Sequence, residues 1–260
     1  MSLLGRNVTG DDVLALWIHI AQNGPIERET LLERYYPGDA EDPDQSDFRK
    51  PLEDAIKFLE EADQLVQQQD SYALKEEYLD APPRVAILRG LRAQTGENEA
   101  YLGILDVLTE KDKRYFDTKN ELDDLLSKEL GSVNWTGNKI NYWARTMSML
   151  GVISPINSDT DENYTHLLSL SQDLLLDILQ DSFSPNNPAK LQSVMNEFDE
   201  TYLPVYATTN RDTVASYLET ALSQAESNDL IELRQASDFG GALNINGSGY
   251  NSLTLRGSGH

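Results

Sequence analysis

Residues 136–168 read TGNKINYWARTMSMLGVISPINSDTDENYTHLL, and this stretch decides the fold. Its apolar residues recur at intervals of three and four, as in an amphipathic helix: Ile140, Trp143, Met147 and Leu150. Thr136 is a residue type that caps the start of a helix, and Gly151 is the type that ends one. Beyond Gly151, apolar residues 152–153 and 166–168 flank a polar segment, which predicts a short β-hairpin. The stretch therefore predicts a capped helix followed by a hairpin.

The same order of helices and hairpin recurs on both sides of this stretch. Before it, apolar periodicity predicts helices and strands over residues 11–22, 27–36, 47–61, 65–66, 72–74, 85–92, 101–108 and 118–130. After it, the pattern predicts helices over residues 174–179, from 191 to before Pro204, and over 212–225, and strands over 230–233, 242–245 and 253–255. Residues 238–241 are predicted to form the turn between the first two of these strands. The chain thus contains the pattern three times.

Helices followed by a hairpin are the order of elements in winged-helix domains. The segment Met147–Ile153 resembles the junction between the third helix and the wing, and Phe58–Val66 and Leu222–Leu233 have the same form. The chain resembles the winged helix-turn-helix superfamily and matches no specific family within it. The resemblance implies an α+β fold, mainly α, made of tandem winged-helix-like units with short β-hairpins. The units are expected over residues 1–80, 81–170 and 171–256, followed by a flexible tail over 257–260.

Composition indicates a globular cytoplasmic protein. The chain has 260 residues, of which 39% are hydrophobic and 25% charged. It has no cysteine, which excludes disulfides, thiolate metal sites and cysteine nucleophiles. No apolar run approaches the roughly 18 residues that span a bilayer, so we expect no membrane partner.

The net charge of −23 has two interpretations. An acidic surface repels nucleic acid and suits a basic protein partner. Alternatively, many carboxylates with few lysines resemble the proteins of halophilic archaea, and we favour this interpretation. At molar salt the Debye length falls to about 3 Å, so a halophile's acidity says little about its partner.

The charge is distributed unevenly along the chain. Residues 1–83 carry a net charge of −12, residues 84–146 a net charge of zero, and residues 147–260 a net charge of −11. The middle segment holds 10 of the 21 basic residues. If the chain contacts a polyanion, we expect this segment to do so.

The sequence contains no motif for catalysis. Its three histidines, His19, His166 and His260, have no metal-binding spacing, and we interpret the first two as partly buried structural residues. The glycine pairs near residues 240 and 248 match neither a phosphate loop nor a dinucleotide-binding turn and are expected in hairpins. Carboxylate pairs are uninformative in so acidic a chain. We therefore expect no enzyme activity, no metal and no cofactor.

The central helix carries the pattern expected of a nucleic-acid reader. A recognition helix in the major groove presents amide, hydroxyl and basic side chains to bases and phosphates. The predicted helix and the basic segment that precedes it supply the candidate nucleic-acid-binding residues: Lys111, Lys113, Arg114, Lys119, Asn138, Lys139, Asn141, Tyr142 and Arg145. An alternative is that residues 111–119 only connect two helices.

Other acidic residues argue against DNA. Asp159, Asp161 and Glu162 occupy the predicted tip of the central wing, where a DNA reader would carry basic residues. In the third unit, Arg211 is accompanied by acidic residues, among them Glu219 and Glu226. At most one unit therefore has the composition of a nucleic-acid reader.

Two functions remain open. The first is a non-catalytic DNA-binding regulator, or a subunit of a DNA-processing complex, in which the central unit contacts DNA. The second is a protein-interaction scaffold, resembling the accessory subunits of condensins that grip a kleisin chain, with Tyr35, Tyr36 and Tyr206 in partner grooves; a homodimer is a further alternative. We favour DNA by a small margin. The deciding feature is whether six basic residues share one face: Arg89, Arg92, Lys113, Arg114, Lys139 and Arg145.

Overall fold

The first group of elements contains three α-helices and a small antiparallel sheet. A computed structural model describes residues 3–8, 10–35, 46–118, 121–131, 133–156, 165–207, 211–237 and 240–256, without the side chains of residues 46–49. Within this part of the chain, the first group comprises η1 (Leu3–Gly5), α1 (Gly10–Asn23), β1 (Ile26–Glu27), α2 (Arg28–Tyr35), α3 (Ser46–Glu61), β2 (Leu65–Gln68), β3 (Ser71–Leu74) and η3 (Glu76–Tyr78). The strands lie in the order β1-β3-β2, with Leu65 opposite Leu74 and Ile26 opposite Tyr72.

The second group repeats this arrangement after one additional helix. Its elements are α4 (Pro83–Arg92), η4 (Gly96–Asn98), α5 (Ala100–Glu110), β4 (Tyr115–Asp117), α6 (Leu122–Glu129), α7 (Gly137–Leu150), β5 (Ile153–Pro155) and β6 (Thr165–Leu168). The strands lie in the order β4-β6-β5, which again places the last strand between the other two. The connection predicted over residues 111–119 thus contains a strand, because Phe116 packs into the core beside Trp143.

The third group has the same order with a hairpin inserted. Its elements are α8 (Gln172–Ser182), β7 (Pro188–Lys190), α9 (Leu191–Thr201), α10 (Ser216–Ser227), β8 (Ile231–Arg234), β9 (Leu243–Ile245), β10 (Ser248–Tyr250) and β11 (Ser252–Leu255). β11 lies between β7 and β8, while β9 pairs with β10. The prediction that residues 230–233 and 242–245 form one hairpin is therefore wrong. β8 pairs with β11 because this register buries Leu253 and Leu255 beside Leu233 and Ile231.

The structure confirms helix α7, which was predicted from residues 136–151, and it confirms both ends of this helix. The Thr136 hydroxyl accepts a hydrogen bond from the Lys139 backbone N–H, and Gly151 ends α7 with a φ of +84°. A Cβ at residue 151 would lie 2.4 Å from the Ser171 Oγ, so the turn into the next strand has room only for glycine. Ser171 in turn caps α8 through the Leu174 backbone N–H. The ends of α7 and α8 therefore follow from local sequence.

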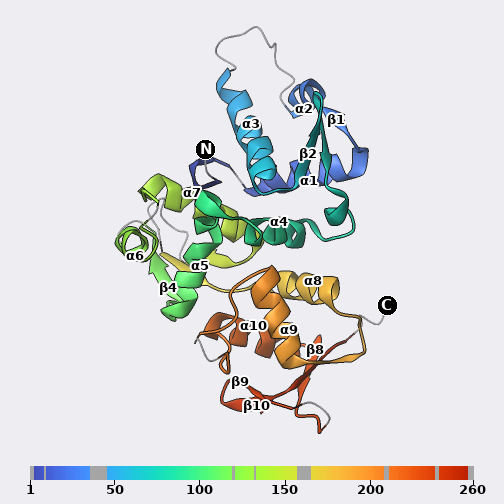
Figure 1. Cartoon of the computed structure of the whole chain (residues 1–260), viewed down its shortest axis with the longest axis vertical. Coiled ribbons are helices and arrows are strands. Elements are labelled where there is room, and N and C mark those ends of the chain that lie inside the picture. Colours follow the sequence, from blue (N-terminus) through green and yellow to red (C-terminus); the bar gives the residue numbers. More distant parts are fainter. Residues whose placement is uncertain are drawn as a thin grey trace.

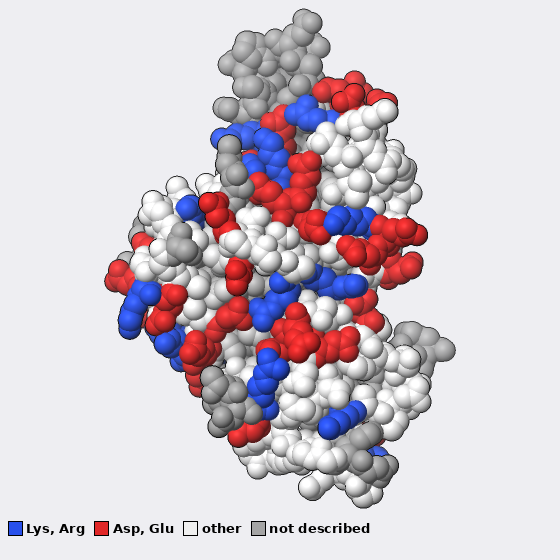
Figure 2. Space-filling model, viewed as in Figure 1, with Lys and Arg blue, Asp and Glu red and all other residues white. Residues whose placement is uncertain are grey.

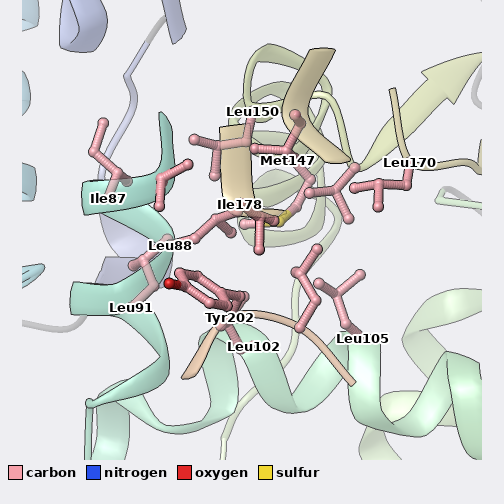
Figure 3. Close-up of a cluster of buried hydrophobic side chains, with 14 of the residues drawn as sticks. Ile87, Leu88, Leu91, Leu102, Leu105, Met147, Leu150, Leu170, Ile178 and Tyr202 are labelled. Atoms are coloured by element: carbon pink, nitrogen blue, oxygen red, sulfur yellow. The ribbon is translucent and has the colours of Figure 1, made fainter. Parts of the chain in front are cut away.

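Helix α4 lies between the first and third groups and packs against both. In Figure 1 it crosses the middle of the molecule, below α1 and above α8. Figure 3 shows its residues Ile87, Leu88 and Leu91 among Leu102 and Leu105 of α5, Met147 and Leu150 of α7, and Ile178 of α8. Buried residues of all three groups belong to one continuous hydrophobic cluster. The α+β class with small sheets and mainly helical elements is confirmed, and the groups share one core.

A buried polar network fixes α4 against the first group. Gln64 is completely buried; its Nε2 donates to the backbone oxygens of Ala62 and Ala86, 3.2 and 3.0 Å away, and its Oε1 accepts from Trp17 Nε1 at 3.1 Å. A buried amide that makes all these bonds specifies one arrangement of its neighbours. The network therefore sets how α4 sits on α1 and α3.

Candidate nucleic-acid interface

The candidate residues on α7 lie on its solvent side but are not equally exposed. The buried face of this helix contains Ile140, Trp143, Ala144, Thr146, Met147 and Leu150. Asn138 and Arg145 are exposed, whereas Lys139, Asn141 and Tyr142 are half-buried. The helical periodicity predicted from the sequence thus places these side chains correctly.

Two of these side chains are engaged within the protein. The Lys139 Nζ donates to the Asn134 carbonyl at 2.7 Å, and the Asn141 Oδ1 accepts from the Thr118 hydroxyl at 3.4 Å. Arg145 makes no hydrogen bond or ion pair with the residues that the structure describes. Of the two basic side chains on α7, Arg145 is therefore the one that remains available to a phosphate.

Two lysines of the basic segment before α6 pair with carboxylates of the chain itself, one at the end of α6 and one directly before it. The Lys111 Nζ lies 3.2 Å from a Glu129 carboxylate oxygen, and the Lys113 Nζ lies 3.5 Å from one of Glu121. The Arg114 carbonyl accepts from the Leu168 backbone N–H at 2.7 Å, which ties β4 to β6. Lys119 lies outside the described residues, as does the predicted acidic wing tip over 157–164. Residues 111–118 therefore lead into β4, an edge strand of the sheet, and do not form a basic segment that is free to bind a phosphate backbone.

The C-terminal end of α7 is covered by the first group. Met149 follows Arg145 by one turn, and a Cβ at Gly10 would lie only 2.1 Å from the Met149 Cβ. Both α1 and η1 pack against α7. A helix covered in this way does not present its full length to a DNA groove.

Two of the six deciding residues face the third group. The Arg89 Nη1 lies 3.5 Å from an Asp181 carboxylate oxygen of α8. Arg92 donates to both Asp106 carboxylate oxygens at 2.9 and 3.0 Å and to the Asp199 carbonyl of α9 at 2.9 Å. These arginines bind one group to another. Arg89 and Arg92 are therefore engaged at the junction with the third group, which argues against six basic residues that share one free face.

Positive side chains do not gather on the face of the molecule drawn in Figure 2. Lysines and arginines are interleaved with carboxylates over this face, and its lower part, formed by the third group, is mainly uncharged. A DNA-binding face needs a continuous positive area. This face does not have one.

Helix α10 is less acidic at its surface than its sequence indicates. Arg211 and Asp212 precede the helix, which begins at Ser216 and not at 212. The Glu219 carboxylate accepts from the Asn246 backbone N–H at 3.1 Å, and that of Glu226 accepts from the Leu233 N–H at 3.2 Å. Both carboxylates hold the inserted hairpin and β8 in place. A neutral groove of about 300 Å³ runs beside them, lined by Thr220, Ser223, Gln224, Ser227, Asn228 and Asn246.

The two histidines that the structure describes have structural surroundings. His19 is 9% exposed and lies edge-on to Tyr35 with ring centroids 5.9 Å apart; burial, together with Arg34, lowers its pKa. His166 stacks on Phe116 at 5.8 Å. Among the described residues, no three histidine, aspartate or glutamate side chains come together as metal ligands. Over the same residues, no helix is both long and apolar enough to cross a membrane.

A cleft between the second and third groups was not predicted from the sequence. It encloses about 490 Å³ and is lined by Arg92, Asp106, Thr109, Glu110, Asp199, Pro204, Tyr206, Ala207 and Arg211. Tyr206 is 9% exposed and donates to the Asn196 side-chain oxygen at 2.7 Å; burial and the nearby Asp199 raise its pKa to about 12. Of the tyrosines predicted to line partner grooves, Tyr206 borders this cleft, Tyr35 packs on α1 beside His19, and Tyr36 lies outside the described residues.

The excess of carboxylates predicts that salt stabilises the fold. With a net charge of −23, the folded chain repels itself, and added ions screen this repulsion. We expect the midpoint of urea unfolding to rise as KCl is increased from about 0.1 to about 1 M. NaCl at equal ionic strength serves as the control and should give the same rise. A midpoint that stays constant or falls would contradict the electrostatic explanation.

Comparison with known proteins assigns no family. No protein-family model matches the chain, and no curated protein matches it. Among solved structures, it is similar to subunit VPS25 of the endosomal trafficking complex ESCRT-II, with 15% sequence identity, coverage of 67% of this chain and 98% of that chain, and a TM-score of 0.25. A TM-score of this size does not establish a shared fold.

Proposed function

We propose that the chain is a non-catalytic, cytoplasmic interaction scaffold that acts as a subunit of a protein assembly, and that its three groups of elements are tandem winged-helix units. The observation that carries the proposal is the engagement of the basic side chains. Lys111, Lys113, Arg89 and Arg92 are paired with carboxylates of the chain itself. Basic side chains that are paired in this way stabilise contacts within the protein and contribute little to the binding of a phosphate backbone.

The repeated order of strands supports the winged-helix interpretation. Apart from the additional helix of the second group and the inserted hairpin of the third, each group has a helix, a short strand, two helices and two further strands, and each three-stranded sheet places its last strand in the centre. In a DNA-binding winged helix the third helix is the reader. Here α7, which holds the corresponding place in the second group, is covered at one end, and α10 in the third group borders an uncharged groove.

The shared core suits a scaffold. Because α4 packs against both neighbouring groups, the three groups hold a fixed orientation and present a preorganised surface. The net charge of −23 favours a partner that carries basic groups. We therefore expect the assembly to depend on protein contacts and not on nucleic acid.

The native size of the assembly tests the proposed function. We expect the tagged chain, purified gently from its own cells, to elute well above the 29.2 kDa of the monomer and to keep that size after nuclease treatment. The purified chain alone serves as the control, because a large size there would indicate a homo-oligomer. An assembly that nuclease reduces to the monomer would overturn the proposal and favour the DNA-binding alternative.

Titration with duplex DNA is the direct test of that alternative. At about 0.15 M salt we expect at most weak binding, and Lys139→Glu/Arg145→Glu should leave it unchanged, because Lys139 already donates to the Asn134 carbonyl and a single unpaired arginine neutralises few phosphates. The matched control is Lys50→Glu/Lys57→Glu, which reverses two exposed charges on α3. Tight binding that weakens with salt and is lost only in the first double variant would place DNA on α7.

A further inference from the structure

The cleft between the second and third groups has a wall of hydrogen-bond acceptors. Asp106, Thr109 and Glu110 lie near the end of α5, and Pro204, Tyr206, Ala207 and Arg211 of the third group also line the cleft. Residues three and four apart share one side of a helix, so Asp106 and Glu110 both face the cleft. The cleft therefore combines two carboxylates from one helix with a wall from the next group.

The two arginines of the cleft are engaged and do not form an anion site. Arg92 uses its Nε, Nη1 and Nη2 on Asp106 and on the Asp199 carbonyl. Arg211 lies over the Tyr206 ring, 5.5 Å from its centre, and donates to the Asp199 carboxylate at 3.3 Å. With three carboxylates against two arginines, the lining is negative by one charge.

Thr109 is the second feature that indicates a ligand. It lines the cleft and is 3% exposed, and its hydroxyl has no hydrogen-bond partner in the part of the chain that the structure describes. A buried hydroxyl without a partner costs free energy, so such a group is usually satisfied by something bound. Glu110 is exposed beside it and makes no ion pair with the described residues.

We propose that this cleft accepts the side chain of a lysine from a protein partner, with the ammonium group at Asp106, Thr109 and Glu110. The inference rests on the proposed scaffold function and names the chemistry of its contact. An ammonium group is compact and has three donors, which matches three acceptors on one helix, whereas a guanidinium is planar and suits a bidentate carboxylate. Pro204 and Ala207 supply apolar surface for the methylene groups of the lysine.

The site would also connect the two groups that form it. Asp106 and Glu110 belong to the second group, while Pro204, Ala207 and Arg211 belong to the third. Partial burial raises the pKa of Asp106, which Arg92 opposes, so a further cation beside this carboxylate favours its charged form. A lysine bound here adds an ion pair at the junction of the two groups.

The test titrates Nα-acetyl-lysine N-methylamide, as the probe, into the purified full chain. Binding is measured from the backbone amide chemical shifts of the chain in NMR spectra. We expect saturable shifts that centre on residues 106–110, 205–207 and 211. The norleucine counterpart, which lacks the charge, should cause none, and the arginine counterpart should bind more weakly. No saturable shift with the lysine probe would overturn the proposal.

Variants of single acceptors identify the contact. We expect Glu110→Gln and Thr109→Val each to weaken binding of the probe by about tenfold, the loss typical of one hydrogen bond to a charged group. Glu33→Gln is the matched control, because Glu33 is an exposed glutamate on α2, far from the cleft in the sequence and not part of its lining. Undiminished binding in Glu110→Gln, or displacement of the probe by KCl at equal concentration, would show a site without preference for lysine and overturn the proposal.

Failure of this inference is distinguishable from failure of the proposed function. The probe is measured on the purified chain, whereas the assembly is measured by its size after nuclease treatment. A nuclease-resistant assembly together with no binding of the probe would keep the scaffold and overturn the lysine site. Binding of the probe together with an assembly of reduced size for Glu110→Gln would support the lysine site as part of the contact.

Discussion

Leu88→Ala is expected to lower the free energy of unfolding by about 2–5 kcal/mol. Leu88 is completely buried on α4 and lies in the cluster that α4, α5, α7 and α8 form (Figure 3). Removing its side chain loses the burial of the apolar atoms and leaves a cavity, because helices from two groups surround the site and cannot all move inward. The substitution therefore tests whether the second and third groups depend on a common core.

Urea unfolding followed by tryptophan fluorescence and by far-ultraviolet circular dichroism measures this effect. The tryptophans report on the first and second groups, while circular dichroism reports on all helices, so coincident transitions indicate that the groups unfold together. Leu79→Ala is the matched control, because Leu79 is 50% exposed and should change stability by at most about 0.5 kcal/mol. Equal effects of the two substitutions would contradict the shared core.

Local signals in the sequence were sufficient for the helices. The position of α7 follows from Thr136, from the spacing of Ile140, Trp143, Met147 and Leu150, and from Gly151. These features act within a few residues of one another, so they can be recognised without knowledge of the tertiary contacts. The same is true of α8, which begins at the cap Ser171.

The first strand of each three-stranded sheet could not be predicted in the same way. β1, β4 and β7 have two or three residues each, too few to show alternation of apolar and polar side chains. Each exists because it pairs with a strand far along the chain: Ile26 lies opposite Tyr72, Phe116 opposite His166 and Ala189 opposite Leu253. Tertiary pairing, not local propensity, determines these strands.

The candidate site was only partly predictable for the same reason. The helical spacing correctly placed Asn138, Lys139, Tyr142 and Arg145 on the outer side of α7. The sequence did not reveal that Arg92 binds the Asp199 carbonyl, 107 residues away, or that Gly10 covers Met149. The charge of a residue can be read from the sequence, but its availability depends on long-range contacts.

Gly90→Ala is expected to destabilise the fold by about 2–4 kcal/mol, although alanine favours a helix over glycine by about 1 kcal/mol. Gly90 lies on the side of α4 that faces the first group. A Cβ there would come within 2.1 Å of the Ala62 carbonyl oxygen and 2.2 Å of the Gln64 Nε2. The first of these atoms belongs to the backbone, and the second belongs to the buried amide that also bonds Trp17 and Ala86. Neither can yield without breaking hydrogen bonds that have no access to water.

Gly137→Ala is the control for Gly90→Ala. It separates the steric clash at residue 90 from the general effect on stability of replacing a glycine in a helix by alanine. Gly137 is the first residue of α7 and has nothing within 4 Å of an added Cβ, so alanine should leave stability unchanged or raise it slightly. We also expect Gly90→Ala, but not Gly137→Ala, to change the fluorescence of Trp17, because its hydrogen bond to Gln64 is disturbed. If both variants were as stable as the parent, α4 would have room to move away from the first group. The close approach at Gly90 would then not fix the orientation on which the scaffold depends.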